Sequence, residues 1–273
     1  VWNPDTDTFD LIGGTAPGNG VGGEAKFSAD GNFLSGTSTI DQEISTAWTR
    51  NVLTDFNFIF KSITFPDNQS QWGYAAVQSL TNNGNGIVLR TLNGGQTWTP
   101  KWEDTNQRGI ESMSFPTQFT GYVCGWNQYF AKTENGGNDW TEMNPAGTDD
   151  VYIYTAVHFT DDLNGVVAAQ LNSGIAIYKT NDGGMSWSTG SGLAGVPAKI
   201  THTANGNLFL VTNGGSIQKS EDGGLNWTTV YTNPSALLLG IRFFNDQIGI
   251  ATGETNIYKT TDGGTTWTSA PVV

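Results

Sequence analysis

Short runs of alternating apolar and polar residues recur along most of the chain. The first run of each set reads apolar, polar, then apolar or aromatic, and this period of two is typical of β-strands. These first runs are Ile63–Phe65, Met113–Phe115, Val157–Phe159, Ile200–His202 and Ile241–Phe243. A second apolar run (72–77, 121–124, 165–169, 208–211, 248–251) and a third (87–89, 129–131, 175–178, 216–218, 256–258) follow in every set. A tryptophan-led segment completes each set, so we predict four strands per set.

A nine-residue segment between the third and fourth runs occurs five times, at 90–98, 132–140, 179–187, 219–227 and 259–267. Its consensus is a basic residue, Thr or Ser, any residue, Asp or Asn, two glycines, two further residues and Trp. Paired glycines supply the positive φ of a tight turn, and Asp or Asn accepts nearby backbone N–H groups. The indole N–H of the tryptophan needs a partner when it is buried. We predict a hairpin turn with structural roles for Asn93, Trp98, Asn135, Trp140, Asp182, Trp187, Asp222, Trp227, Asp262 and Trp267.

Four strands in about 40–47 residues match one blade of a β-propeller. We therefore predict an all-β fold, a single β-propeller of four-stranded antiparallel blades that spans 1–273. Five blades cover about 56–273, and a degenerate first blade covers about 1–55. In that blade Thr8–Ile12 is predicted as the inner strand, 24–27 and 32–35 as middle strands, and Ile40–Ile44 as the turn. Six blades are expected, with seven as the alternative.

The turn segments resemble the Asp-box, or bacterial neuraminidase repeat, whose pattern is Ser/Thr-x-Asp-x-Gly-x-x-Trp. The fuller blade adds Gly-Tyr/Val-Val before Lys-Thr-x-Asp-Gly-Gly-x-x-Trp. In this form it most resembles the photosystem II stability/assembly-factor-like propellers, over roughly residues 60–269. The Asp-box occurs in proteins of many activities, so this resemblance implies the fold strongly and the function weakly.

The charge and the apolar content exclude several classes of partner. The formal net charge is −13 and the pI is about 4.3, so phosphate backbones and anionic membrane surfaces should repel the chain. We predict no nucleic-acid partner, and no transmembrane segment because no apolar run approaches about 20 residues. Cys124 is the only cysteine, which excludes an intrachain disulfide. The chain starts at Val1 without an initiator methionine, as a trimmed product would. We expect a secreted or cell-surface protein, with the periplasm as the alternative.

Aromatic and charged residues outside the repeat are the candidates for a site. Exposed rings beside amides and carboxylates suit sugars, because ring faces stack and hydroxyls find partners. The predicted ligand-binding residues are Trp102, Arg108, Trp126, Tyr129, Tyr152 and Arg242. The catalytic candidates are Glu103, Asp104, Asp149, Asp150 and His158. A glycosidase would need two of these carboxyl groups about 5–5.5 Å or 6.5–9.5 Å apart.

Metal and cofactor chemistry finds little support in the sequence. Two histidines and one cysteine, all dispersed, give no zinc spacing. Asp161 and Asp162 could hold calcium through oxygen ligands, but they suit a turn equally well. We therefore predict no metal and no cofactor. His202 replaces the phenylalanine of the repeat, which predicts a packed histidine.

Three functions follow. The first is an exported, non-catalytic propeller that acts as a binding or scaffold module for a protein or a polysaccharide. The alternative is a carbohydrate-active enzyme, a glycoside hydrolase or polysaccharide lyase, with its site on one face of the propeller. The third, which follows the family resemblance, is an assembly factor for a membrane complex.

Overall fold

The computed structural model describes residues 2–3, 8–12, 24–28, 33–35, 58–66, 71–80, 84–147 and 150–271. The chain divides into two compact units, residues 1–51 and 52–273. Every regular element in these described stretches is a β-strand, and the strands form antiparallel sheets of four. The all-β class and the four-stranded antiparallel sheets predicted from the sequence are confirmed. Among the described residues there is no helix that could span a membrane.

The unit of residues 1–51 contains one sheet, in the order β1 (Trp2–Asn3), β2 (Thr8–Ile12), β3 (Glu24–Ser28) and β4 (Phe33–Ser35). We had predicted Thr8–Ile12 as the inner, first strand of the sheet. In the structure it is the second strand. The first place is taken by β1, because Trp2 and Asn3 pair with Phe9 and Thr8. The predicted turn at Ile40–Ile44 lies outside the described residues.

The unit of residues 52–273 contains five sheets. Their strands are β5 (Phe58–Thr64), β6 (Gly73–Ser79), β7 (Gly86–Thr91) and β8 (Thr99–Glu103); β9 (Ile110–Ser114), β10 (Gly121–Gly125), β11 (Phe130–Thr133) and β12 (Thr141–Glu142); β13 (Val151–Phe159), β14 (Gly165–Leu171), β15 (Gly174–Thr180) and β16 (Ser188–Thr189); β17 (Pro197–His202), β18 (Leu208–Thr212), β19 (Ser216–Ser220) and β20 (Thr228–Thr232); β21 (Leu238–Phe243), β22 (Gly249–Gly253), β23 (Asn256–Thr260) and β24 (Thr268–Pro271). The strands of each sheet are hydrogen-bonded in chain order. Each predicted run falls within one of these strands or overlaps it. The number of blades stays a prediction.

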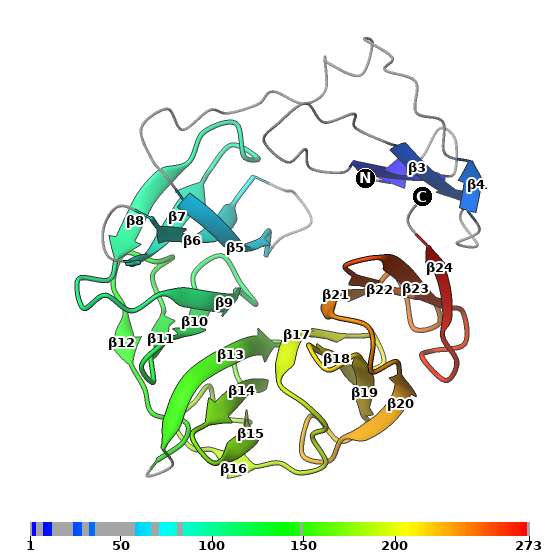
Figure 1. Cartoon of the computed structure of the whole chain (residues 1–273). Coiled ribbons are helices and arrows are strands. Elements are labelled where there is room, and N and C mark those ends of the chain that lie inside the picture. The colour runs from blue at the N-terminus through cyan, green and yellow to red at the C-terminus, as the bar shows by residue number, and fades with distance from the viewer. Residues whose placement is uncertain are drawn as a thin grey trace. The chain divides into compact units, whose positions relative to one another are not determined.

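Within this unit the sheets follow one another in chain order, and their first strands lie side by side (Figure 1). β5 contacts β9, β9 contacts β13, β13 contacts β17, and β17 contacts β21. The apolar core fills the spaces between neighbouring sheets. An aromatic ring of one sheet stacks on the repeat phenylalanine of the next, as Tyr74 does on Phe115 with ring centroids 3.6 Å apart. Burial of these rings is the main favourable contribution to sheet-to-sheet packing.

The repeated segments, which we call the repeat turns, join the third and fourth strands of each sheet. In every repeat turn the Thr or Ser hydroxyl oxygen accepts the N–H of the second glycine at 2.9 Å. The Asp or Asn Oδ1 accepts the N–H of the residue before the tryptophan, also at 2.9 Å in all five. Both glycines have φ between +67° and +99°, which only glycine adopts without strain. The predicted hairpin turn is confirmed.

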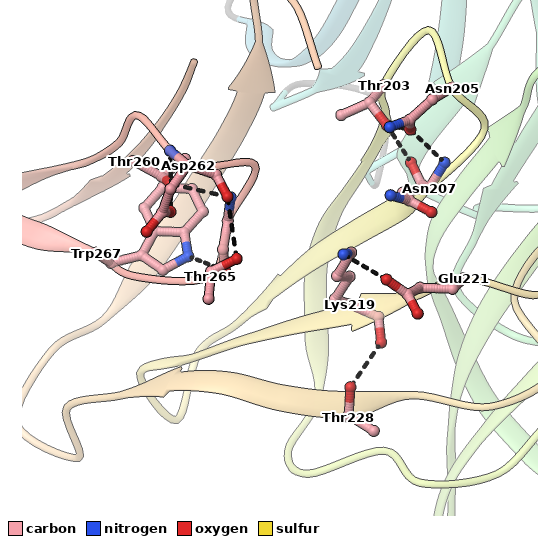
Figure 2. Close-up of polar contacts among 11 residues, drawn as sticks. Thr203, Asn205, Asn207, Lys219, Glu221, Thr228, Thr260, Asp262, Thr265 and Trp267 are labelled. Carbon is pink, nitrogen blue, oxygen red and sulfur yellow. Dashed lines mark hydrogen bonds and ion pairs between the residues drawn. The ribbon is translucent and has the colours of Figure 1, made fainter. Parts of the chain in front are cut away.

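The last repeat turn shows how the tryptophan and the aspartate are held (Figure 2). The indole N–H of Trp267 donates to the carbonyl oxygen of Gly264 at 3.2 Å. The corresponding bond is present for Trp140, Trp187 and Trp227 at 3.0–3.3 Å. Hydrogen bonds from the side chain and the backbone of Thr266 lower the pKa of Asp262 to about 2. The aspartate thus acts as an ionised acceptor that closes the turn.

We predict that replacing Thr260 with valine lowers the free energy of unfolding by about 1–3 kcal/mol, because the buried N–H of Gly264 loses its acceptor. Thr261→Val, one residue along in the same turn and on an exposed side chain, is the matched control and should change stability by less than about 0.5 kcal/mol. Urea unfolding followed by tryptophan fluorescence measures both. Equal effects of the two substitutions would contradict the assigned role of the hydroxyl.

Candidate binding site

The structure brings five of the six predicted ligand-binding residues together in two adjoining groups. In the first group the rings of Trp102 and Tyr129 are stacked, with centroids 5.5 Å apart and planes at 5°. The guanidinium of Arg108 lies over the Tyr129 ring at 4.2 Å. In the second group the Trp126 ring meets Tyr152 edge-on at 5.3 Å. Residues that the sequence places in three separate loops are therefore neighbours in space.

The charges of the first group are neutralised internally. The Asp104 carboxylate is only 1% exposed and accepts the backbone N–H of Arg108 at 2.7 Å and its Nη2–H at 2.8 Å. The same Nη2 also donates to Glu142 at 2.8 Å, and this bond, followed by those to Asp104, raises the pKa of Arg108. Tyr129 is buried beneath them. These residues form a packed connection between two sheets, which leaves neither Asp104 nor the Tyr129 ring face open to a ligand.

Glu111 organises the second group, and our sequence reasoning missed it. Its Oε1 accepts the indole N–H of Trp126 at 2.6 Å and an N–H of Lys61 at 2.9 Å. Lys61 lies on β5 and Glu111 on β9, so this ion pair joins the first strands of neighbouring sheets. We had predicted the strand at Met113–Phe115, whereas β9 begins at Ile110 and includes Glu111.

The remaining carboxylate candidates that the structure describes have local partners, whereas Asp149 lies outside the described residues. Asp150 is exposed and accepts a hydrogen bond from Asn172 Nδ2 at 2.5 Å, and Glu103 accepts one from Asn85 at 3.0 Å. Asp161 accepts the backbone N–H groups of the two residues Leu163 and Asn164 at 2.8 and 2.7 Å, which is the turn arrangement. In the part of the chain that the structure describes, no group of three or more His, Cys, Asp or Glu is arranged to hold a metal.

Two cations on the first strands have no acidic partner among the residues that the structure describes. Lys199 on β17 is largely enclosed, and its Nζ lies 3.4 Å from Ser62 Oγ on β5. The sheets of β5 and β17 are not neighbours in the sequence of strand contacts, so this contact joins first strands that are separated by two other sheets. Burial lowers the pKa of Lys199. Arg242 on β21 is exposed, and none of the ion pairs among the described residues includes either Lys199 or Arg242.

The two histidines lie close enough to these cations for the positive charges to affect their pKa values. His158 Nε2 is 2.7 Å from His202 Nδ1, so one ring nitrogen donates and the other accepts. Burial, followed by the charges of His202 and Lys199, lowers the pKa of His158. Partial desolvation by neighbouring protein atoms, followed by the charge of Arg242, lowers the pKa of His202. We call Lys199, Arg242, His158 and His202 the first-strand site.

His202 is exposed, so our prediction of a packed histidine is wrong. The reason is a break in the aromatic stacking between sheets. Three other boundaries carry a ring on the repeat phenylalanine: Tyr74 on Phe115, Tyr122 on Phe159 and Phe209 on Phe243. At the boundary between β14 and β17 the corresponding positions are Val166 and His202. Without an aromatic partner, the imidazole turns to His158 instead.

Comparison with known proteins places the chain in a family. The family model described as "Photosynthesis system II assembly factor YCF48" matches residues 102–246, which is more than half of the chain. The chain belongs to the YCF48 family. The predicted resemblance to photosystem II assembly-factor-like propellers is therefore confirmed.

One sequence relative agrees with the family, and one solved structure supports the fold. The photosystem II assembly lipoprotein Ycf48 of Synechococcus sp. (strain CC9902) is 27% identical over 139 residues, 48% of this chain and 39% of that protein. The match thus spans about two fifths of the relative's length. A solved structure described as "YCF48 bound to D1 peptide" matches with a TM-score of 0.57 and 20% identity, over 80% of this chain and 70% of that one.

Two further solved structures have the same fold. An ancestral GH74 enzyme matches with a TM-score of 0.58 and 19% identity, over 77% of this chain and 31% of that one. The WD40 β-propeller domain of Doa1 matches with a TM-score of 0.58 and 8% identity, over 81% and 71%. Together with the YCF48 structure they confirm a propeller fold, and at these identities they say nothing of activity.

We predict that Asp104→Asn destabilises this YCF48-family chain by about 3–5 kcal/mol, because it leaves the guanidinium of Arg108 poorly paired in a largely buried place. Glu142→Gln removes the exposed partner of the same arginine and should cost less than about 1 kcal/mol. Thermal unfolding of both variants separates the two roles. An Asp104→Asn variant as stable as the wild type would show that this carboxylate does not hold the two sheets together.

Proposed function

We propose that this chain is a non-catalytic, protein-binding propeller whose first-strand site takes an acidic segment of a partner. The observation that carries the proposal is an enclosed ammonium group, Lys199, with no carboxylate partner among the described residues. The chain has a net charge of −13, and yet, within the described part of the chain, neither this cation nor Arg242 forms an ion pair with a carboxylate. An enclosed charge is costly unless it is paired. A carboxylate from outside supplies the missing partner.

The rest of the site suits the same ligand. Arg242 offers a planar, two-pronged donor for a carboxylate, and Lys199 offers a compact positive charge. The hydrogen-bonded histidine pair adds one further N–H, because only one proton is needed between the two facing nitrogens. An acidic side chain or a chain-terminal carboxylate can therefore meet several donors at once.

The relatives agree with a protein partner. The similar structure with YCF48 is described as bound to a D1 peptide, and the curated relative is named a photosystem II assembly lipoprotein. We propose by analogy that this chain also binds a segment of another protein, in support of the assembly of a complex. The lipoprotein name further supports our expectation that the chain works outside the cytoplasm.

A glycan partner and carbohydrate chemistry receive no such support. Their aromatic candidates Trp102 and Tyr129 pack against each other, and Asp104 is held by Arg108. The proposal is therefore restricted to a protein partner.

The test is the binding of a fluorescein-labelled Ala/Glu peptide, measured by anisotropy. Lys199→Met should weaken binding at least about tenfold, because a hydrogen bond to a charged group contributes about 1.5–3 kcal/mol. The control is Lys101→Met, which changes the net charge equally but lies on the fourth strand β8. An Ala/Lys peptide should not bind at this site. Equal affinities of the two variants, or no binding by the wild type, would contradict the proposal.

A further inference from the structure

The repeat provides an internal comparison that singles out two exposed apolar side chains. In four sheets one loop residue before the second strand accepts, through its carbonyl oxygen, the N–H of the first glycine of the repeat turn at 2.9 Å. These residues are Gln71, Phe119, Leu163 and Gln247. The bond is the same for glutamine as for an apolar residue, so the fold does not require Phe119 or Leu163 to be apolar. Both are nevertheless 55% exposed.

The repeat turns carry two more such departures. Met185 follows the second glycine of its turn, where the other turns have Gln96, Asn138, Leu225 and Thr265, and it is 87% exposed. Leu92 follows the hydroxyl residue of its turn, where the others have Glu134, Asn181, Glu221 and Thr261. It is also exposed. Neither side chain is explained by the turn it belongs to.

These side chains gather at one end of three consecutive sheets, because loops after first strands and turns after third strands lie at the same end of an antiparallel sheet. Trp72 meets Phe119 edge-on at 5.6 Å, across two sheets. Tyr122 Oη donates to the carbonyl oxygen of Gly183 at 3.2 Å, which ties the second of these sheets to the turn that carries Met185. We call Trp72, Leu92, Phe119, Leu163 and Met185 the rim patch.

The surroundings of the rim patch are acidic. Glu134, Asp139, Asp161 and Asp162 are exposed in the same loops and turns. The basic residues beside them are already engaged: Arg90 donates to the Gly136 carbonyl at 3.0 Å, and Lys132 pairs with Glu134 at 2.7 Å. None of the ion pairs among the described residues includes Asp139, Asp161 or Asp162. These three carboxylates outnumber the one guanidinium of Arg90, so the charge around the patch is negative, opposite to that of the first-strand site.

We propose that the rim patch docks a basic amphipathic segment of a partner protein. Apolar side chains of the segment would cover Phe119, Leu163 and Met185, and its lysines or arginines would meet the surrounding carboxylates. Exposed apolar residues within a charged rim are the usual composition of a protein-binding surface. This proposal is independent of the first-strand site, which takes the opposite charge.

The experiment uses a fluorescein-labelled Leu/Lys amphipathic peptide and two counterparts, one with glutamate for lysine and one with serine for leucine. The test variant is Phe119→Gln/Leu163→Gln, which installs the residue that two other sheets carry at this position. The matched control is Leu239→Gln, which removes an exposed leucine on β21. Melting temperatures confirm that both variants fold.

The wild type and Leu239→Gln should bind the Leu/Lys peptide equally, and the double variant should bind it at least about tenfold more weakly. Both counterpart peptides should bind weakly, and Lys199→Met should leave Leu/Lys binding unchanged. Equal binding by the double variant, or equal binding of the Leu/Glu peptide, would overturn the proposal.

Sedimentation velocity tests whether a second copy of this chain occupies the patch instead. Self-association that only the double variant abolishes would assign the patch to that second copy and would overturn the proposal. Binding to phosphatidylglycerol vesicles through the patch would assign it to a membrane and would also overturn the proposal.

Discussion

One hydrogen bond, made five times, governs the unit of residues 52–273. A Thr or Ser hydroxyl accepts the N–H of the second turn glycine, and this fixes the turn that delivers a tryptophan to its place. The residue before that hydroxyl extends the effect to the next sheet. Arg90 and Lys179 donate to backbone carbonyls of the following repeat turn, at Gly136 and Asp222. Local sequence thus becomes packing between sheets, as in other repeat architectures.

The site that we propose for partner binding lies where the repeat is broken. At one boundary the aromatic stack is lost, because Val166 and His202 replace the usual ring pair, and a hydrogen-bonded histidine pair takes its place. On the first strands a lysine replaces a neutral or packed residue, and its hydrogen-bond partner within the described ranges is the Ser62 hydroxyl. Both departures concern polar groups. A regular scaffold can carry such local costs because the other sheets supply the stability.

The sequence predicted what depends on short spacings, namely the strands, the repeat turns and the family. It could not predict contacts between distant residues. Arg108 bridges Asp104 to Glu142, 34 residues away, and Lys199 meets Ser62 across 137 residues. These partners depend on the relative orientation of neighbouring sheets. For this reason Trp102 and Tyr129 were predicted as ligand-binding residues, although their rings pack against each other. His202 was misjudged for the same reason, since its environment is set by Val166 on a neighbouring sheet.

The most direct test of the account is the pKa of the Lys199 ammonium, measured by NMR of its side-chain carbon with and without the Ala/Glu peptide. The account predicts a pKa below the ordinary value of about 10.4 in the free protein, because the group is enclosed and the described residues supply no carboxylate to pair with it. It predicts a rise when the peptide's carboxylates bind. An ordinary pKa in the free protein, or a value unchanged by saturating peptide, would contradict it.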